Sequence, residues 1–149
     1  MRAVVQRVTD AKVSVDDKVT GSIGKVLCVL LGVEADDEKK DLDYIAEKVA
    51  GLRIFDDENG VMNRSVMDVK GEILSISQFT LLGDVRHGKR PSWIRAERPE
   101  KANEMYLKFN DVLRARGINV EEGVFQAEML VEIHNDGPVT ILLDSKKLF

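Results

Sequence analysis

The chain has 149 residues, of which 44% are hydrophobic and 32% are charged, and its formal net charge is −4 at pH 7. This length suits one compact domain spanning residues 1–149, and the composition is too apolar for a disordered chain. The negative charge argues against a protein that coats long stretches of nucleic acid, because such binding needs many contacts between cations and phosphates.

The cysteine and apolar content indicate a reducing compartment. Cys28 is the single cysteine, so an internal disulfide is excluded, and it lies in an apolar run where burial is expected. No apolar run approaches the roughly 18 residues that a membrane helix needs, and no apolar segment follows a basic start. We therefore expect a cytoplasmic protein without membrane contact.

In chain order, the first part predicts strands and then one helix. Residues 2–8 and 12–15 have the pattern of short strands, and residues 25–33 form an apolar run that suits a strand covered on both faces. Apolar residues at helical spacing over residues 36–52 predict an amphipathic helix. Residues 56–60 form an acidic turn that lacks the ligand spacing of a calcium loop, so no metal site is expected there.

The second part predicts more strands around a second helix. Pro99 stands where a helix would begin, apolar residues follow at helical spacing, and Gly117 ends the pattern. The strand-like or connecting segments are residues 63–69, 72–82, 120–126 and 127–133. A tight turn at residues 135–138 and a strand to Leu143 complete the chain. Several strands with two inserted helices predict an α+β or mixed-sheet fold.

Arg7 lies on an apolar strand and has two open interpretations. It shares a face with Ala3 and Val5 in the alternating pattern, which points the guanidinium inward, where backbone carbonyls would have to accept its hydrogen bonds. At the edge of a sheet it would instead reach solvent, which the pattern alone slightly favours.

A basic stretch interrupts the acidic background between Val85 and Arg98. Its charged residues are Arg86, Lys89, Arg90, Arg95, Glu97 and Arg98. Such a stretch is either a local binding site for nucleic acid or a solvated loop without a partner.

Conventional catalytic motifs are scarce. The histidines are His87 and His134, and no zinc-binding or nucleophile-elbow motif is present, so a metal site is not expected. Ser77, His134 and Asp136 could form a triad, but a structural histidine is the favoured interpretation of His134. Backbone N–H groups between Ser77 and Leu81 could instead stabilise an oxyanion, with the Ser77 and Thr80 hydroxyls assisting; capping or packing is the alternative for these hydroxyls.

Two motifs together resemble those of the D-aminoacyl-tRNA deacylases, also called D-tyrosyl-tRNA deacylases. They are Ser77-Gln78-Phe79-Thr80-Leu81 and Asn135-Asp136-Gly137-Pro138-Val139-Thr140. The opening residues 1–8 and the segment Arg90-Pro91-Ser92 are also similar to this family. The resemblance covers essentially the whole chain, and it implies a barrel-like core of mixed and antiparallel strands, two amphipathic helices and a homodimer.

The resemblance also implies an activity, which is hydrolysis of the ester in D-aminoacyl-tRNA, and of glycyl-tRNA, as chirality proofreading in translation. The catalytic residues would be Ser77, Gln78, Phe79 and Thr80, with no cofactor, and the 2′-hydroxyl of the terminal adenosine would take part. The Gly137–Pro138 bond would be cis, although a trans turn is favoured on the residues alone, and its carbonyls would enter the pocket of the partner subunit to reject L-aminoacyl esters.

The remaining implied roles concern support and binding. Arg7, Met129 and Asn135 would support the site, with Arg7 holding the Gly137–Pro138 segment. Arg86, Lys89 and Arg90 would contact the acceptor end of tRNA.

Two other functions remain open from the residues. A non-catalytic RNA-end or protein-binding module would use the basic loop as its footprint and Gly137-Pro138 only as a turn. A small-ester or peptide hydrolase would use Ser77 with His134.

Overall fold

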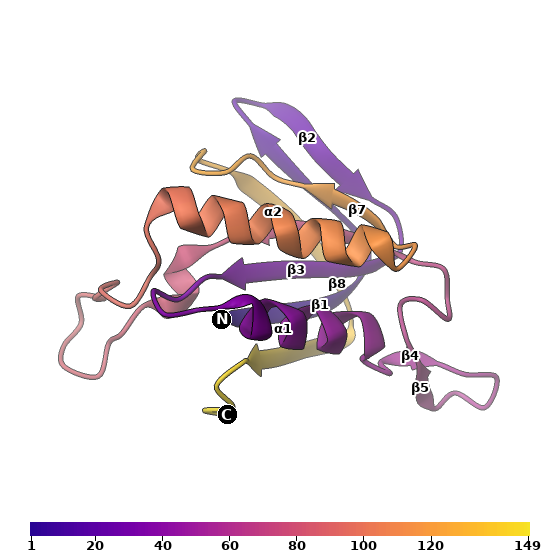
Figure 1. Ribbon diagram of the computed structural model, residues 1–149. Helices are drawn as coiled ribbons and strands as arrows, with labels where there is room; N and C mark the ends of the chain where they lie inside the picture. The colour runs from indigo at the N-terminus through magenta and orange to yellow at the C-terminus, as the bar shows by residue number, and fades with distance from the viewer.

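The computed structural model describes residues 1–149, in which a curved mixed sheet carries two helices (Figure 1). The main strands are β1 (Arg2–Val15), β2 (Lys18–Ile23), β3 (Val26–Gly32), β6 (Glu72–Ser77), β7 (Asn119–Glu122) and β8 (Leu130–Asp144). The helices are α1 (Lys39–Gly51), α2 (Pro99–Ala115) and the 3₁₀ turn η1 (Phe79–Leu82). A hairpin of β4 (Phe55–Asp56) and β5 (Met62–Arg64) projects from the body.

The sheet is mixed and nearly closed. Its strand order is β2-β1-β3-β6-β7, with β8 pairing on β1; β3, β6 and β7 run parallel, and β1 is antiparallel to β2, β3 and β8. The two ends of this order approach at Gly21 of β2, where an added Cβ would lie 2.8 Å from the carbonyl oxygen of Glu122 in β7. The expected α+β fold with a barrel-like sheet and two helices is confirmed.

The alternation of side chains along β3 divides the apolar core in two. Leu27, Val29 and Leu31 belong to the larger cluster, which also contains the buried faces of α1 and α2. Cys28 belongs to a smaller cluster inside the sheet, and its burial raises the pKa of the thiol to about 12. The predicted burial of Cys28, and of β3 on both faces, is confirmed.

Both predicted helices are present, with shifted ends. α1 starts at Lys39 because the Asp41 carboxylate accepts the Glu38 N–H at 2.9 Å and closes the first turn. α2 starts at Pro99, and Gly117 follows its end with a φ of +83°. No helix combines the length and the apolar composition required to cross a membrane.

The acidic segment at residues 56–60 is a turn, as predicted. It connects β4 to β5, and the Asp57 carboxylate accepts the N–H groups of Asn59 at 2.8 Å and Val61 at 3.1 Å. These bonds use the carboxylate to close the turn.

Several predicted strand boundaries are wrong. Residues 2–15 form one strand, because β8 pairs with β1 along almost its whole length. The strand predicted over residues 72–82 ends at Ser77, and the apolar pattern continues through η1, whose Leu82 is buried. The strand predicted at residues 120–126 ends at Glu122, and that predicted at residues 127–133 starts only at Leu130.

Candidate active site

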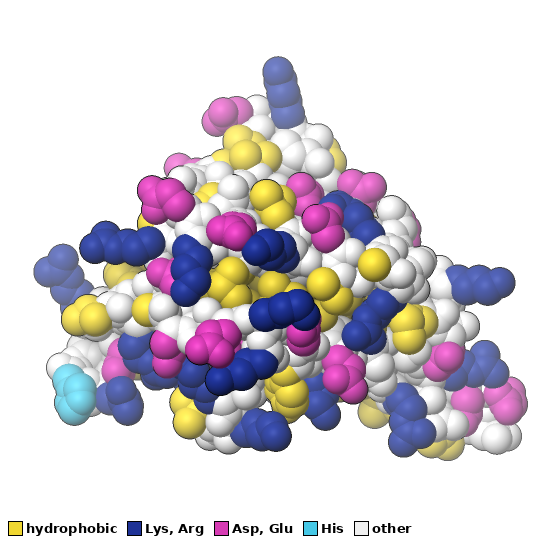
Figure 2. All heavy atoms as spheres, viewed as in Figure 1, with side chains coloured by type: hydrophobic (Ala, Val, Ile, Leu, Met, Phe, Trp, Pro, Cys, Tyr) yellow, Lys and Arg dark blue, Asp and Glu magenta, His cyan; other side chains and the backbone are white.

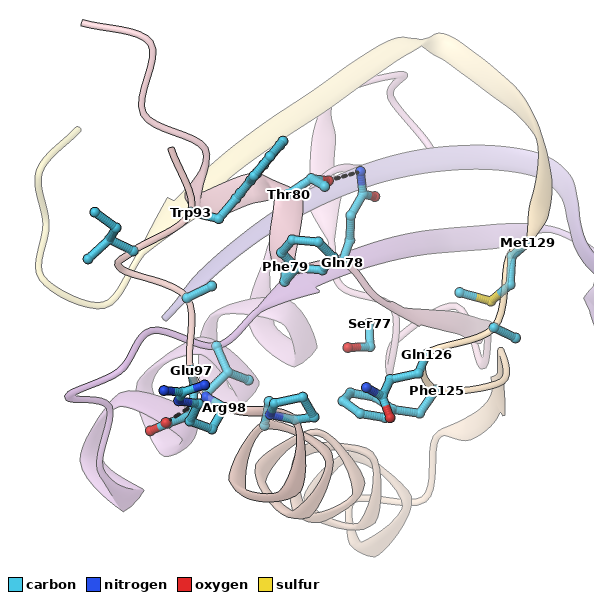
Figure 3. A pocket seen from close by; sticks show the side chains of 16 residues that line it. Ser77, Gln78, Phe79, Thr80, Trp93, Glu97, Arg98, Phe125, Gln126 and Met129 are labelled. Atoms are coloured by element: carbon cyan, nitrogen blue, oxygen red, sulfur yellow. Dashed lines mark hydrogen bonds between the residues drawn. The ribbon is translucent and has the colours of Figure 1, made fainter. Parts of the chain in front are cut away.

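A cavity of about 820 Å³ lies between the carboxyl end of β6 and the start of α2 (Figure 3). It is lined by Val33 and by residues from the segments 77–80, 93–102 and 125–129. Its volume is within the range of pockets that hold small-molecule ligands. Five residues predicted for the site line this cavity together, namely Ser77, Gln78, Phe79, Thr80 and Met129.

The end of β6 determines where residues 77–80 lie. β6 runs parallel to β3, and the Gln78 N–H donates to the Leu31 carbonyl at 2.7 Å, which holds the chain at the sheet. The chain then turns, and the Leu81 N–H donates back to the Gln78 carbonyl at 3.3 Å. Ser77 is therefore half-buried at the strand end, whereas Phe79 and Thr80 are exposed in the turn.

This turn carries hydrogen-bond donors in residues that line the cavity. The N–H groups of Phe79 and Thr80 stand in the first turn of η1, where no carbonyl of the same turn can accept them. The Thr80 hydroxyl accepts from the Gln78 amide at 3.1 Å, which leaves its own proton free to donate (Figure 3). The wall can thus stabilise a negatively charged oxygen through backbone and hydroxyl groups.

The start of α2 forms the opposite wall. The Glu97 carboxylate accepts from Lys101 at 2.9 Å and from the Arg98 N–H at 2.7 Å. Partial burial opposes ionisation of Glu97, but these hydrogen bonds outweigh it and lower the pKa of the carboxyl. Glu97 is therefore ionised near neutral pH and is a poor general acid.

Several lining residues were not predicted as site residues. Arg98 was counted only as part of the basic stretch, and Trp93 carried no signal that distinguished it from a loop residue. Phe125 and Gln126 were assigned to a strand, but they lie in a turn where Gln126 has a φ of +62°. Positive φ is uncommon outside glycine, and nothing in the local sequence indicated it.

Gly137 and Pro138 lie in a bulge of β8, and the peptide bond between them is cis. β8 advances five residues from Asn135 to Thr140 while its partner β1 advances two from Gln6 to Val8. The predicted hairpin turn between two strands is therefore wrong, because both halves of β8 pair with the same long strand.

Arg7 lies opposite this bulge and holds it. Its guanidinium donates to the carbonyl oxygens of Asp136 at 3.3 Å and Ile54 at 2.7 Å, and its side chain is 13% exposed. The inward interpretation of Arg7, with backbone carbonyls as acceptors, is thus confirmed. The Asn135 side chain stabilises the same bulge, accepting the Val139 N–H at 3.3 Å and donating to the Thr140 hydroxyl at 3.1 Å.

One chain does not bring the two motifs together. Along β3, Leu27 lies opposite Arg7 and Leu31 lies opposite Ser77. These positions are four residues apart, which corresponds to roughly 13 Å of strand. Accordingly, neither Gly137 nor Pro138 lines the cavity.

The basic stretch divides into paired and unpaired cations. Arg86 forms a fork with the Asp84 carboxylate, with Nε to Oδ1 at 3.0 Å and Nη2 to Oδ2 at 2.6 Å, and these bonds hold the pKa of Asp84 well below its usual range. Arg95 is paired with Glu34. Lys89, Arg90 and Arg98 are exposed and form no ion pair. Figure 2 shows basic side chains on the projecting loop at the left.

No catalytic triad forms within one chain. His134 lies beside Asp10 of β1, with Nδ1 2.9 Å from the carboxylate, and it does not line the cavity that contains Ser77.

The carboxylates of Glu34, Asp36 and Asp37 lie within 4.8 Å of one another, but they are outside this cavity, and Lys146 and Arg95 pair with members of the group. These cations occupy the oxygens that a metal ion would require.

Comparisons with known proteins agree over the full chain. The family model described as "D-Tyr-tRNA(Tyr) deacylase" matches residues 4–144. The chain is 60% identical to a protein of Fervidobacterium nodosum and 60% identical to a protein of Koribacter versatilis, in both cases over 149 residues and 100% of each chain. Both relatives are named D-aminoacyl-tRNA deacylase.

Solved structures give the same fold. The structure of a c-Myc DNA unwinding element binding protein superposes with a TM-score of 0.91 at 43% identity, covering 97% of this chain and 98% of that one. A probable eukaryotic D-amino acid tRNA deacylase superposes with a TM-score of 0.82 at 18% identity, covering 96% and 98%, which shows a shared fold.

Proposed function

This chain belongs to the D-aminoacyl-tRNA deacylase family, and we propose that it hydrolyses the ester of D-aminoacyl-tRNA with backbone donors in the cavity beside residues 77–80. It is thus a hydrolase that acts on the ester between an amino acid and tRNA. The observation that carries the proposed mechanism is the cavity wall, where N–H and hydroxyl groups gather and no histidine is within reach.

The proposed reaction needs few protein groups. Water attacks the ester carbonyl carbon, the bond from that carbon to the ribose oxygen breaks, and the ribose oxygen receives a proton from the water. An aminoacyl ester is already activated, so a positioned water and donors for the oxyanion are sufficient. The Phe79 and Thr80 N–H groups are the donors, and the 2′-hydroxyl of the terminal adenosine assists in place of a protein base.

The chiral filter of this proposal comes from a second copy of the chain. Gly137 and Pro138 are exposed and lie apart from the cavity of their own chain, so they are free to enter the cavity of a partner. Carbonyl oxygens placed against the α-carbon of the substrate leave room for hydrogen but not for a side chain. L-aminoacyl esters are then rejected, whereas glycyl esters are accepted.

Exposed apolar residues of β8 support this homodimer. Leu130 is 65% exposed and Leu142 is 57% exposed, on the strand that carries the bulge. Large apolar side chains exposed along one strand are candidates for burial by a partner. In a cell the dimer would act as a chirality proofreader of translation, and we place it in the cytoplasm.

The test is release of amino acid from tRNA charged with D-tyrosine, L-tyrosine or glycine, with and without a chelator. We expect rapid loss of the D-tyrosyl and glycyl esters, slow loss of the L-tyrosyl ester and no effect of the chelator. If none of the three esters is hydrolysed, the non-catalytic RNA-binding module would be the better explanation of the function. Equal rates of hydrolysis of the D-tyrosyl and L-tyrosyl esters would support the esterase activity but contradict the chiral filter.

A variant distinguishes the backbone mechanism from the Ser77 and His134 hydrolase. Because His134 lies outside the cavity, we expect His134→Ala to retain the rate of D-tyrosyl ester hydrolysis within about twofold. A loss of 100-fold or more, of the size seen when a general base is removed, would favour the side-chain mechanism.

A further inference from the structure

Two aromatic rings stand exposed at the mouth of the cavity. Phe79 is 56% exposed and Trp93 is 40% exposed, and their ring centroids are 5.9 Å apart in an edge-to-face arrangement of 68° (Figure 3). Large aromatic side chains are usually buried when their only role is to pack. The exposure of both rings beside one cavity therefore indicates a surface that meets a ligand.

The backbone on both sides fixes the position of Trp93. Asp84 and Ser92 exchange two hydrogen bonds of 2.8 Å and 2.9 Å, which close the projecting loop just before Trp93. After it, the Ala96 N–H donates to the Trp93 carbonyl at 3.0 Å. The indole is thus presented by a closed turn, and a rigid aromatic ring loses little conformational entropy when a ligand stacks on it.

Unpaired cations occur in the segments that precede and follow Trp93. Arg98 lines the same cavity, and Lys89 and Arg90 belong to the loop that leads to Trp93. The other two cations of the stretch, Arg86 and Arg95, are engaged by carboxylates. The stretch around Trp93 therefore combines a flat apolar ring with three unpaired cations and one carboxylate, Glu97, that is engaged by Lys101. Aromatic rings with nearby cations are the combination that binds single-stranded nucleic acid.

We propose that Trp93 is the stacking platform for the base of the nucleotide that precedes the terminal adenosine of tRNA, with the adjoining phosphate facing Arg98. This inference rests on the proposed function, in which the cavity beside Phe79 holds the terminal aminoacyl adenosine. The strand must leave that cavity toward solvent, and Trp93 and Arg98 are exposed residues of its lining. Base stacking on aromatic rings tolerates any sequence, so the platform suits an enzyme that accepts many tRNAs.

The alternative role for Trp93 is structural support of Phe79. In that case, removal of the indole would disturb the cavity itself, and every substrate would lose activity equally. A platform for the preceding nucleotide predicts a larger loss for substrates that contain this nucleotide. The two roles therefore separate when a full substrate is compared with one that ends at the terminal adenosine.

The experiment measures kcat/KM of the full-length protein on D-tyrosyl-tRNA and on D-tyrosyl-adenosine. The variants are Trp93→Ala, Trp93→Leu, which keeps apolar bulk without a flat ring, and Trp93→Phe, which keeps a ring. Leu107→Ala is the matched control, because Leu107 is an exposed apolar residue of α2 outside the cavity. Thermal unfolding and size-exclusion chromatography of each variant monitor stability and oligomeric state.

For Trp93→Ala and Trp93→Leu we expect the ratio of kcat/KM for D-tyrosyl-tRNA to that for D-tyrosyl-adenosine to fall by roughly 5- to 150-fold, the range for loss of one stacked base. Trp93→Phe should restore most of the ratio, and Leu107→Ala should leave it unchanged. An unchanged ratio in Trp93→Ala, an equal loss on both substrates or a changed oligomeric state would overturn the platform. A parent protein inactive on both D-tyrosyl esters would instead overturn the proposed function.

Discussion

Gly137 combines an unusual backbone conformation with close neighbours. Its φ is +122°, a conformation that residues with a side chain rarely adopt. A Cβ added there would lie 2.9 Å from Nη2 of Arg7 and 2.9 Å from Cγ2 of Val139. Arg7 in turn is held by the Ile54 carbonyl at 2.7 Å, so it cannot withdraw without breaking that bond.

The first prediction follows from these contacts. We expect Gly137→Ala to displace the bulge and to lower the ratio of D-tyrosyl-tRNA to L-tyrosyl-tRNA hydrolysis by about tenfold or more, in line with about 1–3 kcal/mol of backbone strain. Rate measurements on both charged tRNAs give this ratio. Gly60→Ala is the control, since Gly60 also has positive φ but no atom within 4 Å of an added Cβ. If Gly137→Ala kept the parent ratio of D-tyrosyl-tRNA to L-tyrosyl-tRNA hydrolysis, the bulge would not determine chiral selectivity.

The second prediction concerns the cations of the basic stretch. Because Arg86 is paired with Asp84 whereas Lys89 and Arg90 are unpaired, we expect Lys89→Gln and Arg90→Gln to weaken tRNA binding more than Arg86→Gln does. Each lost phosphate contact should reduce the slope of log affinity against log salt by about 0.7 to 0.9. Binding titrations at several salt concentrations test this. Equal slopes in all variants and the parent would mean that the loop does not contact phosphate.

At the scale of elements, α2 and β6 are joined by a buried polar contact beneath the cavity. The Tyr106 hydroxyl of α2 donates to the Ser75 carbonyl of β6 at 2.7 Å, and both residues are buried. Ser75 is two residues before Ser77, so this bond holds the strand end on which the site depends. Burial raises the pKa of Tyr106, because the ionised phenolate would lose its hydration.

The third prediction is that Tyr106→Phe lowers the free energy of unfolding by about 0.5–1.5 kcal/mol, because a buried hydrogen bond is lost while the Ser75 carbonyl keeps the Gly123 N–H at 3.2 Å as its other donor. The sign of the pH dependence follows from the raised pKa. The parent should lose stability as pH rises above about 10, where tyrosine ionises in the unfolded chain first. Urea unfolding between pH 7 and 11 should show that the difference between parent and variant shrinks above pH 10. A constant difference would contradict this role.

Some elements of the fold could be predicted from the sequence and others could not. The two helices and β3 follow from periodicity, because each buries one face or both faces against its neighbours. The end of β6 was missed because Leu82 continues the apolar pattern, although it is buried from a 3₁₀ turn. The continuity of β8 was missed because it depends on pairing with β1, more than a hundred residues away in sequence.

The candidate site could be predicted only in part, because some of its residues are brought together by tertiary contacts that the local sequence does not show. Residues 77–80 were predicted from a motif and Met129 from the family resemblance, and these five residues line one cavity. Trp93, Phe125 and Gln126 were not found, because their place in the wall arises from tertiary contacts between segments that are distant in sequence. The alternating pattern allowed an inward Arg7 but slightly favoured a side chain in solvent, because its acceptors at Ile54 and Asp136 lie on other segments of the chain.

At the scale of the whole molecule, the account requires two copies of the chain. A barrel-like sheet with two helices places the cavity and the Gly137–Pro138 bulge at different ends of the strands, so the proposed site would combine the cavity of one copy with the bulge of another. A two-fold symmetric dimer would contain two such sites. Variants that damage the two parts separately can therefore complement each other.

Subunit complementation is the measurement that tests this claim most directly. Thr80→Ala damages the cavity and Gly137→Ala damages the bulge, so a mixed dimer of the two variants has one intact site and one doubly damaged site. In an equal mixture with random pairing, about a quarter of all sites should combine an intact cavity with a damaged bulge, so hydrolysis of L-tyrosyl-tRNA should fall to about a quarter of the Gly137→Ala rate. If cavity and bulge act within one chain, about half of the sites have this combination, and a rate of about half would contradict the shared site.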